Sequence, residues 1–372
     1  MRAAERTEVL VVGAGPAGLA TSQALARRGI EHRVIERGER IGYSWANLYD
    51  SLTLHTGKHM SALPGMRFPR SAPMFVGREQ FVGYLERYAR SFALPVETGV
   101  EMTGAVRKEG GWRVTTTHGE IEAAALVIAT GIIANPQLPR VPERERFGGR
   151  VLHSIEYRRP EPFLGRRVLV VGVGNSGGEI ASELGAAGAE VTVAVRSGAN
   201  VVPLRLFGIP IQYTAFYLRK LPRRAQEAVV AAVGKLTELR RGPPVLPRPA
   251  HSPLDQIPLI GFHLVDAIRA GKVRVRGAVA EFTPEGMRFA DGKEEPFEHV
   301  IFATGFRAAL APLRELVRVD ERGFALRTDR VTSADQPDLY FVGHNYDATG
   351  GLYNIARDAG LAAERIAATA TV

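Results

Sequence analysis

The sequence predicts an α/β fold that consists of two doubly wound, Rossmann-like dinucleotide-binding domains, the second inserted into the first. Two apolar runs, EVLVVGAGPAG and RRVLVVGVGNSGG, each lead into spaced glycines, and each predicts one nucleotide-binding unit. Two further runs, ALVIATG at 125–131 and HVIFATG at 299–305, are alike and flank the second unit. A chain of 372 residues can fill two cores, because single cores rarely grow beyond about 250–300 residues.

Composition and charge are those of a globular protein that handles phosphorylated ligands. Hydrophobic residues make up 45% of the chain, and no apolar run approaches the roughly 18 residues that span a bilayer. The net charge of +9 is scattered along the sequence, so we expect no nucleic-acid partner. The N-terminal residues lack a secretory pattern, which predicts a cytoplasmic protein without an integral membrane segment. Because cysteine is absent, disulfides and thiolate metal ligands are excluded, and no metal site is predicted.

The first unit has the pattern of a dinucleotide-binding βαβ element. Gly13 permits a tight turn, Gly15 lets the backbone approach a pyrophosphate, and Gly18 allows the helix to pack closely on the strand. A second strand, EHRVIER, places Glu36 about 20 residues further on, where a carboxylate accepts hydrogen bonds from a ribose. We therefore expect a nucleotide with a free ribose here, as in FAD. A glycine-rich tight turn without a ligand is the alternative.

The second unit repeats this pattern with one change. Gly172, Gly174 and Gly177 again separate a strand from a helix, but the next strand leads to Arg196 instead of a carboxylate. An arginine suits a 2′-phosphate, so this unit is expected to bind NADPH, unless Arg196 is an ordinary surface residue.

The start of the second helix supplies further candidates. Asn175 and Ser176 would present backbone amides to a pyrophosphate, and the side chain of Asn175 could join them or act as an N-cap.

The two ATG strands predict where the chain passes between domains. The FAD-binding domain is expected at 1–140 and 305–372, and the NADPH-binding domain at 141–304. The segment NPQLPRVP supports an extended crossing because proline fixes φ. Two ordinary strand ends are the alternative. Thr130 and Thr304 of these strands are also candidate cofactor-binding residues.

A further strand, PDLYFVG, ends at Gly343, another candidate cofactor-binding residue, and a helical pattern follows it. The N-terminus of that helix could stabilise charge on a reduced flavin or serve packing alone.

The order of the first glycine motif, FGGRVLHSIEY, the second glycine motif and ATGF resembles the class B flavin-containing monooxygenases. Their identifying pattern is F-x-G-x-x-x-H-x-x-x-[YF], and it is filled at every position by Phe147, Gly149, His153 and Tyr157. The resemblance covers nearly the whole chain and is strongest to the plant auxin-forming (YUCCA) branch. It implies that the signature supports the junction of the NADPH domain and takes no part in the chemistry.

The resemblance also implies an activity. NADPH would reduce FAD, and reduced FAD would react with O₂ to a C4a-(hydro)peroxyflavin that passes one oxygen atom to a small organic substrate. That substrate would be a nucleophilic nitrogen or sulfur compound or a keto acid. Two alternatives stay open: an NADPH oxidase that forms H₂O₂, and a non-catalytic NADPH-binding or sensing flavoprotein. A flavin disulfide reductase is set aside because it needs cysteine.

Two positions are candidates for contact with the flavin. His55 stands where amine-oxidising members of the family usually have Asn and where the plant branch has His, so it favours a keto acid and is the candidate catalytic residue. A hydrogen-bonded core histidine is the alternative. Trp45, near Tyr43, is expected to form a wall for the flavin or to be a core aromatic.

Residues 201–263 mix apolar, basic and proline-rich stretches. We expect a lid-like segment that faces the substrate, although a membrane-surface region or a partner-binding face fits the composition too. Oligomerisation stays open.

Overall fold

The computed structural model describes residues 5–347 and 349–369, and it confirms the mixed α/β class. The chain forms two compact units. Unit 1 comprises Met1–Asn47, Leu52–Asn135 and Phe306–Val372, and unit 2 comprises Leu48–Ser51 and Pro136–Gly305. Unit 1 is therefore discontinuous in sequence, and a short excursion at 48–51 joins unit 2.

Unit 1 is built on a seven-stranded sheet. Its strands are β1 (Glu5–Val12), β2 (His32–Glu36), β3 (Val96–Thr98), β4 (Met102–Lys108), β5 (Gly111–Thr116), β6 (Gly119–Ile128) and β19 (Leu339–Phe341). Their order is β3-β2-β1-β6-β5-β4, and β19 also pairs with β6. The strand β6 pairs with antiparallel β5 along its first half and with parallel β19 along its second half. The parallel core is thus extended by an antiparallel meander.

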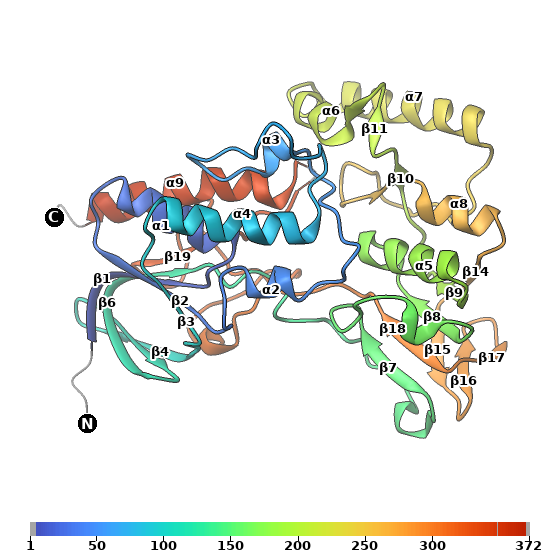
Figure 1. Cartoon of the computed structure of the whole chain (residues 1–372), viewed down its shortest axis with the longest axis horizontal. Helices are drawn as coiled ribbons and strands as arrows, with labels where there is room; N and C mark the ends of the chain where they lie inside the picture. The colour runs from blue at the N-terminus through green and yellow to red at the C-terminus, as the bar shows by residue number, and fades with distance from the viewer. Residues whose placement is uncertain (1–4, 348, 370–372) are drawn as a thin grey trace. The chain divides into compact units, whose positions relative to one another are not determined.

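The helices of unit 1 are α1 (Pro16–Ala26), α2 (Tyr43–Ala46), α3 (Lys58–Ser61), α4 (Arg78–Ser91) and α9 (Gly351–Thr369). Figure 1 shows α1, α4 and α9 together over the sheet, although α9 comes from the opposite end of the sequence. Strand β1 is buried on both faces, as its continuous apolar run predicts. Val9 and Val11 pack on the helix side, whereas Leu10 and Val12 pack on the other side.

Unit 2 is built on a five-stranded parallel sheet of order β14-β9-β8-β18-β7. Its strands are β7 (Arg150–His153), β8 (Arg167–Val171), β9 (Glu190–Ala194), β14 (Val273–Arg276) and β18 (His299–Phe302). Two helices, α5 (Asn175–Ala187) and α8 (His263–Arg269), pack against each other and onto these strands. An antiparallel sheet of β15 (Val279–Phe282), β16 (Gly286–Phe289) and β17 (Glu294–Pro296) completes the core.

The two units differ from a strictly doubly wound arrangement in the same way. In unit 1 the face of the sheet opposite α1 packs against Trp112 of β5 and the segment 308–325, which contains the short helix η3 (Ala311–Leu313). In unit 2 a cluster that includes Val171, Phe282 and Phe302 joins the parallel sheet to the antiparallel one. On the second face, unit 1 thus has Trp112 of β5 and the largely irregular segment 308–325, and unit 2 has an antiparallel sheet, in place of the helices of a doubly wound fold.

Residues 201–263 form short elements and one long helix in unit 2. These elements are β10 (Val201–Val202), β11 (Arg205–Leu206), β12 (Ile209–Pro210), α6 (Ile211–Leu218), α7 (Arg223–Arg241) and β13 (Leu259–Ile260). No residue of α7 is buried, and Phe207 and Leu239 are 77% and 84% exposed. The lid-like role of this segment stays a prediction. Within the described residues, no helix is both long and apolar enough to cross a membrane.

Candidate nucleotide-binding sites

The first glycine turn joins β1 to α1, and its three glycines have different surroundings. Gly13 has a φ of +108°, and a Cβ there would lie 2.6 Å from the carbonyl oxygen of Ala129. A Cβ on Gly18 would lie 1.7 Å from the carbonyl oxygen of Gly13. Apart from its chain neighbours, no described atom lies within 4 Å of a Cβ built on Gly15. The fold itself thus requires glycine at 13 and 18, while the space at 15 is open to a phosphate at the N-terminus of α1.

Glu36 is the last residue of β2, and its carboxylate is held beside this turn. The backbone N–H of Ala14 donates to its Oε2 at 2.8 Å, and the N–H of Gly38 donates to its Oε1 at 2.9 Å. The residue is 8% exposed. Because each carboxylate oxygen can accept two hydrogen bonds, both oxygens keep capacity for the hydroxyls of a ribose.

Other predicted residues of unit 1 converge on the same turn. The N–H of Gly42 donates to the carbonyl of Ala14 at 3.0 Å, which brings α2 and its Trp45 to the turn. A Cβ on Gly343 would lie 3.2 Å from the Cβ of Ala17 in α1. Trp45 is half-buried and packs edge-on against Phe81 of α4, with ring centroids 4.7 Å apart. Trp45 is therefore not a fully buried core aromatic, and part of its surface remains available to a ligand.

The second glycine turn joins β8 to α5 and has the same construction. Gly172 has a φ of +102°, and a Cβ there would lie 2.6 Å from the carbonyl oxygen of Ala303. A Cβ on Gly177 would lie 2.1 Å from the carbonyl oxygen of Gly172, whereas one on Gly174 would meet no described atom within 4 Å. In each glycine turn, the middle glycine is thus the one where the fold leaves space for a side chain, and a phosphate could approach the backbone there.

The ATG strands explain why both turns are alike. Ala129 and Ala303, the first residues of the two ATG triplets, supply the carbonyl groups that exclude a side chain at the tight-turn glycines. The hydroxyl of Thr130 donates to the carbonyl of Ala309 at 3.0 Å, and that of Thr304 donates to the carbonyl of Gln137. Both hydroxyls therefore use their single donor on the connecting segments, while the hydroxyl oxygens and the backbone of these threonines stay candidates for cofactor binding.

The start of α5 departs from one expectation. The side chain of Asn175 accepts from the N–H of Ile260 at 2.8 Å and donates to the carbonyl of Pro258 at 3.2 Å, so it holds β13 instead of capping the helix. Gly174 occupies the N-cap position. The backbone amides of Asn175 and Ser176 remain candidates for a pyrophosphate, while the Asn175 side chain is already bonded.

Arg196 follows β9 and is exposed. It has no ion pair or hydrogen-bond partner among the described residues, unlike many arginines of this chain. An exposed guanidinium two residues beyond the end of the second strand can reach a 2′-phosphate without first breaking an ion pair.

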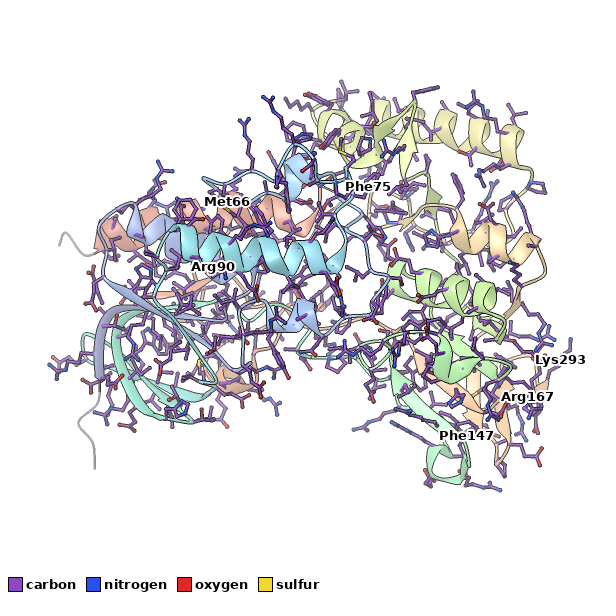
Figure 2. The ribbon with its side chains drawn as sticks, in the orientation of Figure 1. Met66, Phe75, Arg90, Phe147, Arg167 and Lys293 are labelled. Carbon is purple, nitrogen blue, oxygen red and sulfur yellow. The ribbon has the colours of Figure 1, made fainter. Side chains whose placement is uncertain are left out.

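The signature residues lie inside unit 2. Phe147 precedes β7 (Figure 2) and packs against Phe282 at 5.3 Å between ring centroids. A Cβ on Gly149 would lie 2.4 Å from the ring of Phe147, so glycine is needed for the ring to fold back over the chain.

The other two signature residues form polar bonds within the same unit. The Nε2 of His153 lies 3.2 Å from the carbonyl of Gly305, and its Nδ1 accepts from the N–H of Ile155 at 3.3 Å, which assigns a neutral ring that donates from Nε2. Burial lowers the pKa of His153, in agreement with this neutral form. The hydroxyl of Tyr157 donates to Oε2 of Glu183 in α5 at 2.7 Å. These contacts support a structural role for the signature.

His55 lies in unit 1 between Leu54 and α3 and is half-buried. A half-buried imidazole keeps surface for a ligand, which a core histidine would lack. Its place near a flavin stays a prediction. Among the described residues, no group of three or more His, Cys, Asp or Glu side chains could hold a metal ion.

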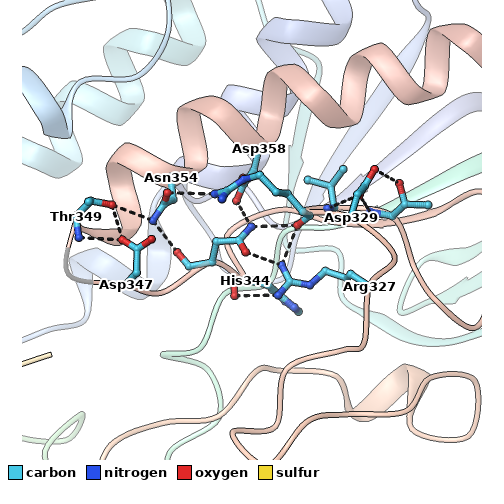
Figure 3. Close-up of polar contacts among 11 residues, drawn as sticks. Arg327, Asp329, His344, Asp347, Thr349, Asn354 and Asp358 are labelled. Atoms are coloured by element: carbon cyan, nitrogen blue, oxygen red, sulfur yellow. Dashed lines mark hydrogen bonds and ion pairs between the residues drawn. The ribbon is translucent and has the colours of Figure 1, made fainter. Parts of the chain in front are cut away.

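A polar cluster fixes the loop that follows Gly343 (Figure 3). Arg330 donates from Nε to Oδ1 of Asp358 at 2.7 Å, and Asn345 donates from Nδ2 to Oδ2 of the same carboxylate at 2.6 Å. Arg330 also donates to Oδ1 of Asn354 at 3.1 Å, and Arg327 donates to Oδ1 of Asn345 at 3.1 Å. The loop between β19 and α9 is thus tied to the middle of α9. No pattern in the sequence indicated this cluster.

The chain is similar to known proteins of one family. Residues 6–329 match the family described as FMO-like, flavin-binding monooxygenase-like. Indole-3-pyruvate monooxygenase YUCCA1 of Oryza sativa subsp. japonica is 37% identical over 310 residues, which cover 80% of this chain and 76% of that protein. The probable indole-3-pyruvate monooxygenase YUCCA1 of Arabidopsis thaliana is 34% identical over 312 residues, with 80% and 75% covered. The structure of the flavin-containing monooxygenase from Stenotrophomonas maltophilia is similar, with a TM-score of 0.78, 26% identity, and 98% and 99% of the two chains covered.

Proposed function

The chain belongs to the flavin-binding monooxygenase-like family and is a flavin-containing monooxygenase, and from this premise we propose that unit 1 binds FAD and unit 2 binds NADPH. The open space at Gly15 and the spare acceptor capacity of Glu36 support FAD in unit 1. The open space at Gly174 and the unpaired guanidinium of Arg196 support NADPH in unit 2. The FAD-binding domain would span about residues 1–135 and 306–372, with the NADPH-binding domain between them.

When bound, FAD would supply the redox chemistry by which a hydride from NADPH and O₂ give an oxygenated small organic substrate, with the second oxygen atom released as water. The chain's own residues bind and orient the two nucleotides: Gly15 and Gly174 admit the phosphates, Glu36 fixes a ribose, and Arg196 selects the 2′-phosphate. We propose a keto acid as substrate, because the relatives at 34–37% identity carry the name indole-3-pyruvate monooxygenase. His55 at the plant-type position supports the same class.

Oxygen consumption with product analysis tests this function. FAD-loaded protein is mixed with NADPH in air, with and without indole-3-pyruvate, and NADPH oxidation, H₂O₂ and oxygenated product are measured together. We expect the keto acid to divert NADPH oxidation from H₂O₂ to product. If H₂O₂ accounts for all NADPH oxidised with keto acids, amines and sulfides alike, the protein is an NADPH oxidase and the monooxygenase proposal fails.

Replacing Arg196 should change the choice between NADPH and NADH. Arg196→Ala removes a charged hydrogen-bond donor, and such bonds contribute about 1.5–3 kcal/mol, so we expect the KM for NADPH to rise about tenfold or more. The KM for NADH should change little. Arg274→Ala, which removes another exposed arginine of unit 2, is the matched control. Equal effects on both nucleotides would remove Arg196 from recognition of the 2′-phosphate.

Replacing His55 should change the fraction of NADPH oxidation that ends as H₂O₂. If His55 lies by the flavin, His55→Asn replaces the imidazole with a smaller side chain and admits water, so the fraction of NADPH oxidation that ends as H₂O₂ should rise severalfold. His59→Asn, four residues along the same segment and exposed, should leave that fraction unchanged. An unchanged fraction in His55→Asn as well would return His55 to a structural role.

A further inference from the structure

Residues 48–51 form a strap that leaves unit 1, joins unit 2 and returns. On its N-terminal side the chain has just completed α2, which carries Trp45. On its C-terminal side the chain reaches His55 within four residues of Ser51. The strap is therefore joined by very short connections to both residues that we expect near the flavin.

The strap is bonded to the first turns of α5 and to the signature segment. The N–H of Asp50 donates to the carbonyl of Arg158 at 2.9 Å, and Nη1 of Arg158 donates back to the carbonyl of Leu48 at 3.0 Å. Tyr49 is 3% exposed, and its hydroxyl donates to Oε2 of Glu179.

The environment of Tyr49 keeps its phenol protonated. Burial raises the pKa of Tyr49, the charge of Glu179 raises it further, and a hydrogen bond with the side chain of Ser176 opposes them. Tyr49 therefore acts as a donor, and it contacts the second and fifth residues of α5. The glycine turn of the proposed NADPH site lies directly before these residues, at the start of the same helix.

We propose that Tyr49 is a positioning residue that links the occupancy of the NADPH site at α5 to the placement of the flavin-side segment. The inference rests on the proposed function of the two units. The step that it serves is transfer of a hydride, two electrons with one proton, from NADPH to FAD, which leaves NADP⁺ and reduced FAD. Because misplacement of reacting groups by about 1 Å can cost about a hundredfold in rate, a strap that is no longer held at α5 should slow this step.

Two pairs of variants test the role of the hydroxyl. Tyr49→Phe removes only the oxygen that donates to Glu179. Glu179→Gln keeps an acceptor for Tyr49, whereas Glu179→Ala removes it. Tyr88→Phe is the matched control, because Tyr88 is also fully buried and its hydroxyl donates to the carbonyl of Pro64 at 2.7 Å within unit 1.

The measurements separate positioning from folding. At saturating NADPH without oxygen, flavin reduction should slow about tenfold or more in Tyr49→Phe and Glu179→Ala, and change little in Glu179→Gln and Tyr88→Phe. FAD content and the Kd of NADPH should stay near those of the wild type. Independently of turnover, NADP⁺ should slow hydrogen exchange of peptides that contain residues 48–51 in the wild type but not in Tyr49→Phe.

Normal flavin reduction in Tyr49→Phe, or NADP⁺-dependent protection of the strap that survives this substitution, would overturn the inference. A loss shared equally by Tyr88→Phe would do the same, because it would mark a general effect of removing a buried hydroxyl. A wild-type protein that binds no FAD, or whose FAD NADPH does not reduce, would instead overturn the proposed function, and this inference with it.

Discussion

Gly15→Val is expected to give a folded but colourless protein that no longer binds FAD. Gly15 has a φ of −81° and a ψ of −172°, an extended conformation that valine adopts readily, and no described atom outside its chain neighbours would meet the new Cβ within 4 Å. The cost to the apoprotein is about 1 kcal/mol, because valine is a poorer N-cap than glycine. The isopropyl group fills the space through which a pyrophosphate must approach the backbone. Flavin absorbance and thermal unfolding of the apoprotein measure the two effects separately.

Two other glycines provide the controls. Gly18→Ala places a Cβ 1.7 Å from the carbonyl oxygen of Gly13, so it should prevent folding of unit 1 and lose FAD for that different reason. Gly174→Val, the equivalent change in unit 2, should retain FAD and lose binding of NADPH. A yellow, fully loaded Gly15→Val protein would contradict the assignment of FAD to unit 1.

The local parts of both sites could be predicted from the sequence because they depend on backbone sterics within one βαβ element. The spacing of Gly13, Gly15 and Gly18 and the position of Glu36 follow from a strand, a turn and a helix in order. The parts supplied from afar could not be predicted. Ala129 lies more than a hundred residues from the glycine that its carbonyl group constrains, and no periodicity reports that contact.

The same limit applies to the strap and to the second face of each sheet. Residues of unit 1 flank 48–51 on both sides, and bonds to distant residues, such as that of Tyr49 to Glu179, 130 residues away, hold this segment in unit 2. Asn175 looked available to a ligand, yet its amide is bonded to a strand 83–85 residues further along the chain. Sequence patterns predict which elements form and give less information on what covers them, so the doubly wound prediction did not include the antiparallel strands.

Asp358→Ala is expected to destabilise unit 1 by about 3 kcal/mol, near the lower end of the range for breaking a buried ion pair. The Asp358 side chain is 0% exposed, and burial raises its pKa while hydrogen bonds from Asn345 and Arg330 oppose that effect. Its removal leaves the guanidinium of Arg330 and the amide of Asn345 without their acceptor. Because the side chain of Arg330 is 27% exposed, water recovers part of the loss. Urea unfolding of the apoprotein measures the change.

The comparison with a surface pair shows whether burial is the cause. Glu86→Ala breaks the ion pair with Arg40, whose side chain is 53% exposed, and should cost less than about 1 kcal/mol. Asp358→Asn keeps an acceptor and should fall between the two. If Asp358→Ala unfolds at the same urea concentration as Glu86→Ala, the cluster does not hold the loop after Gly343. If it is destabilised as expected, FAD affinity should fall together with stability, because the carboxylate of Asp358 bonds Asn345, two residues after Gly343, to α9.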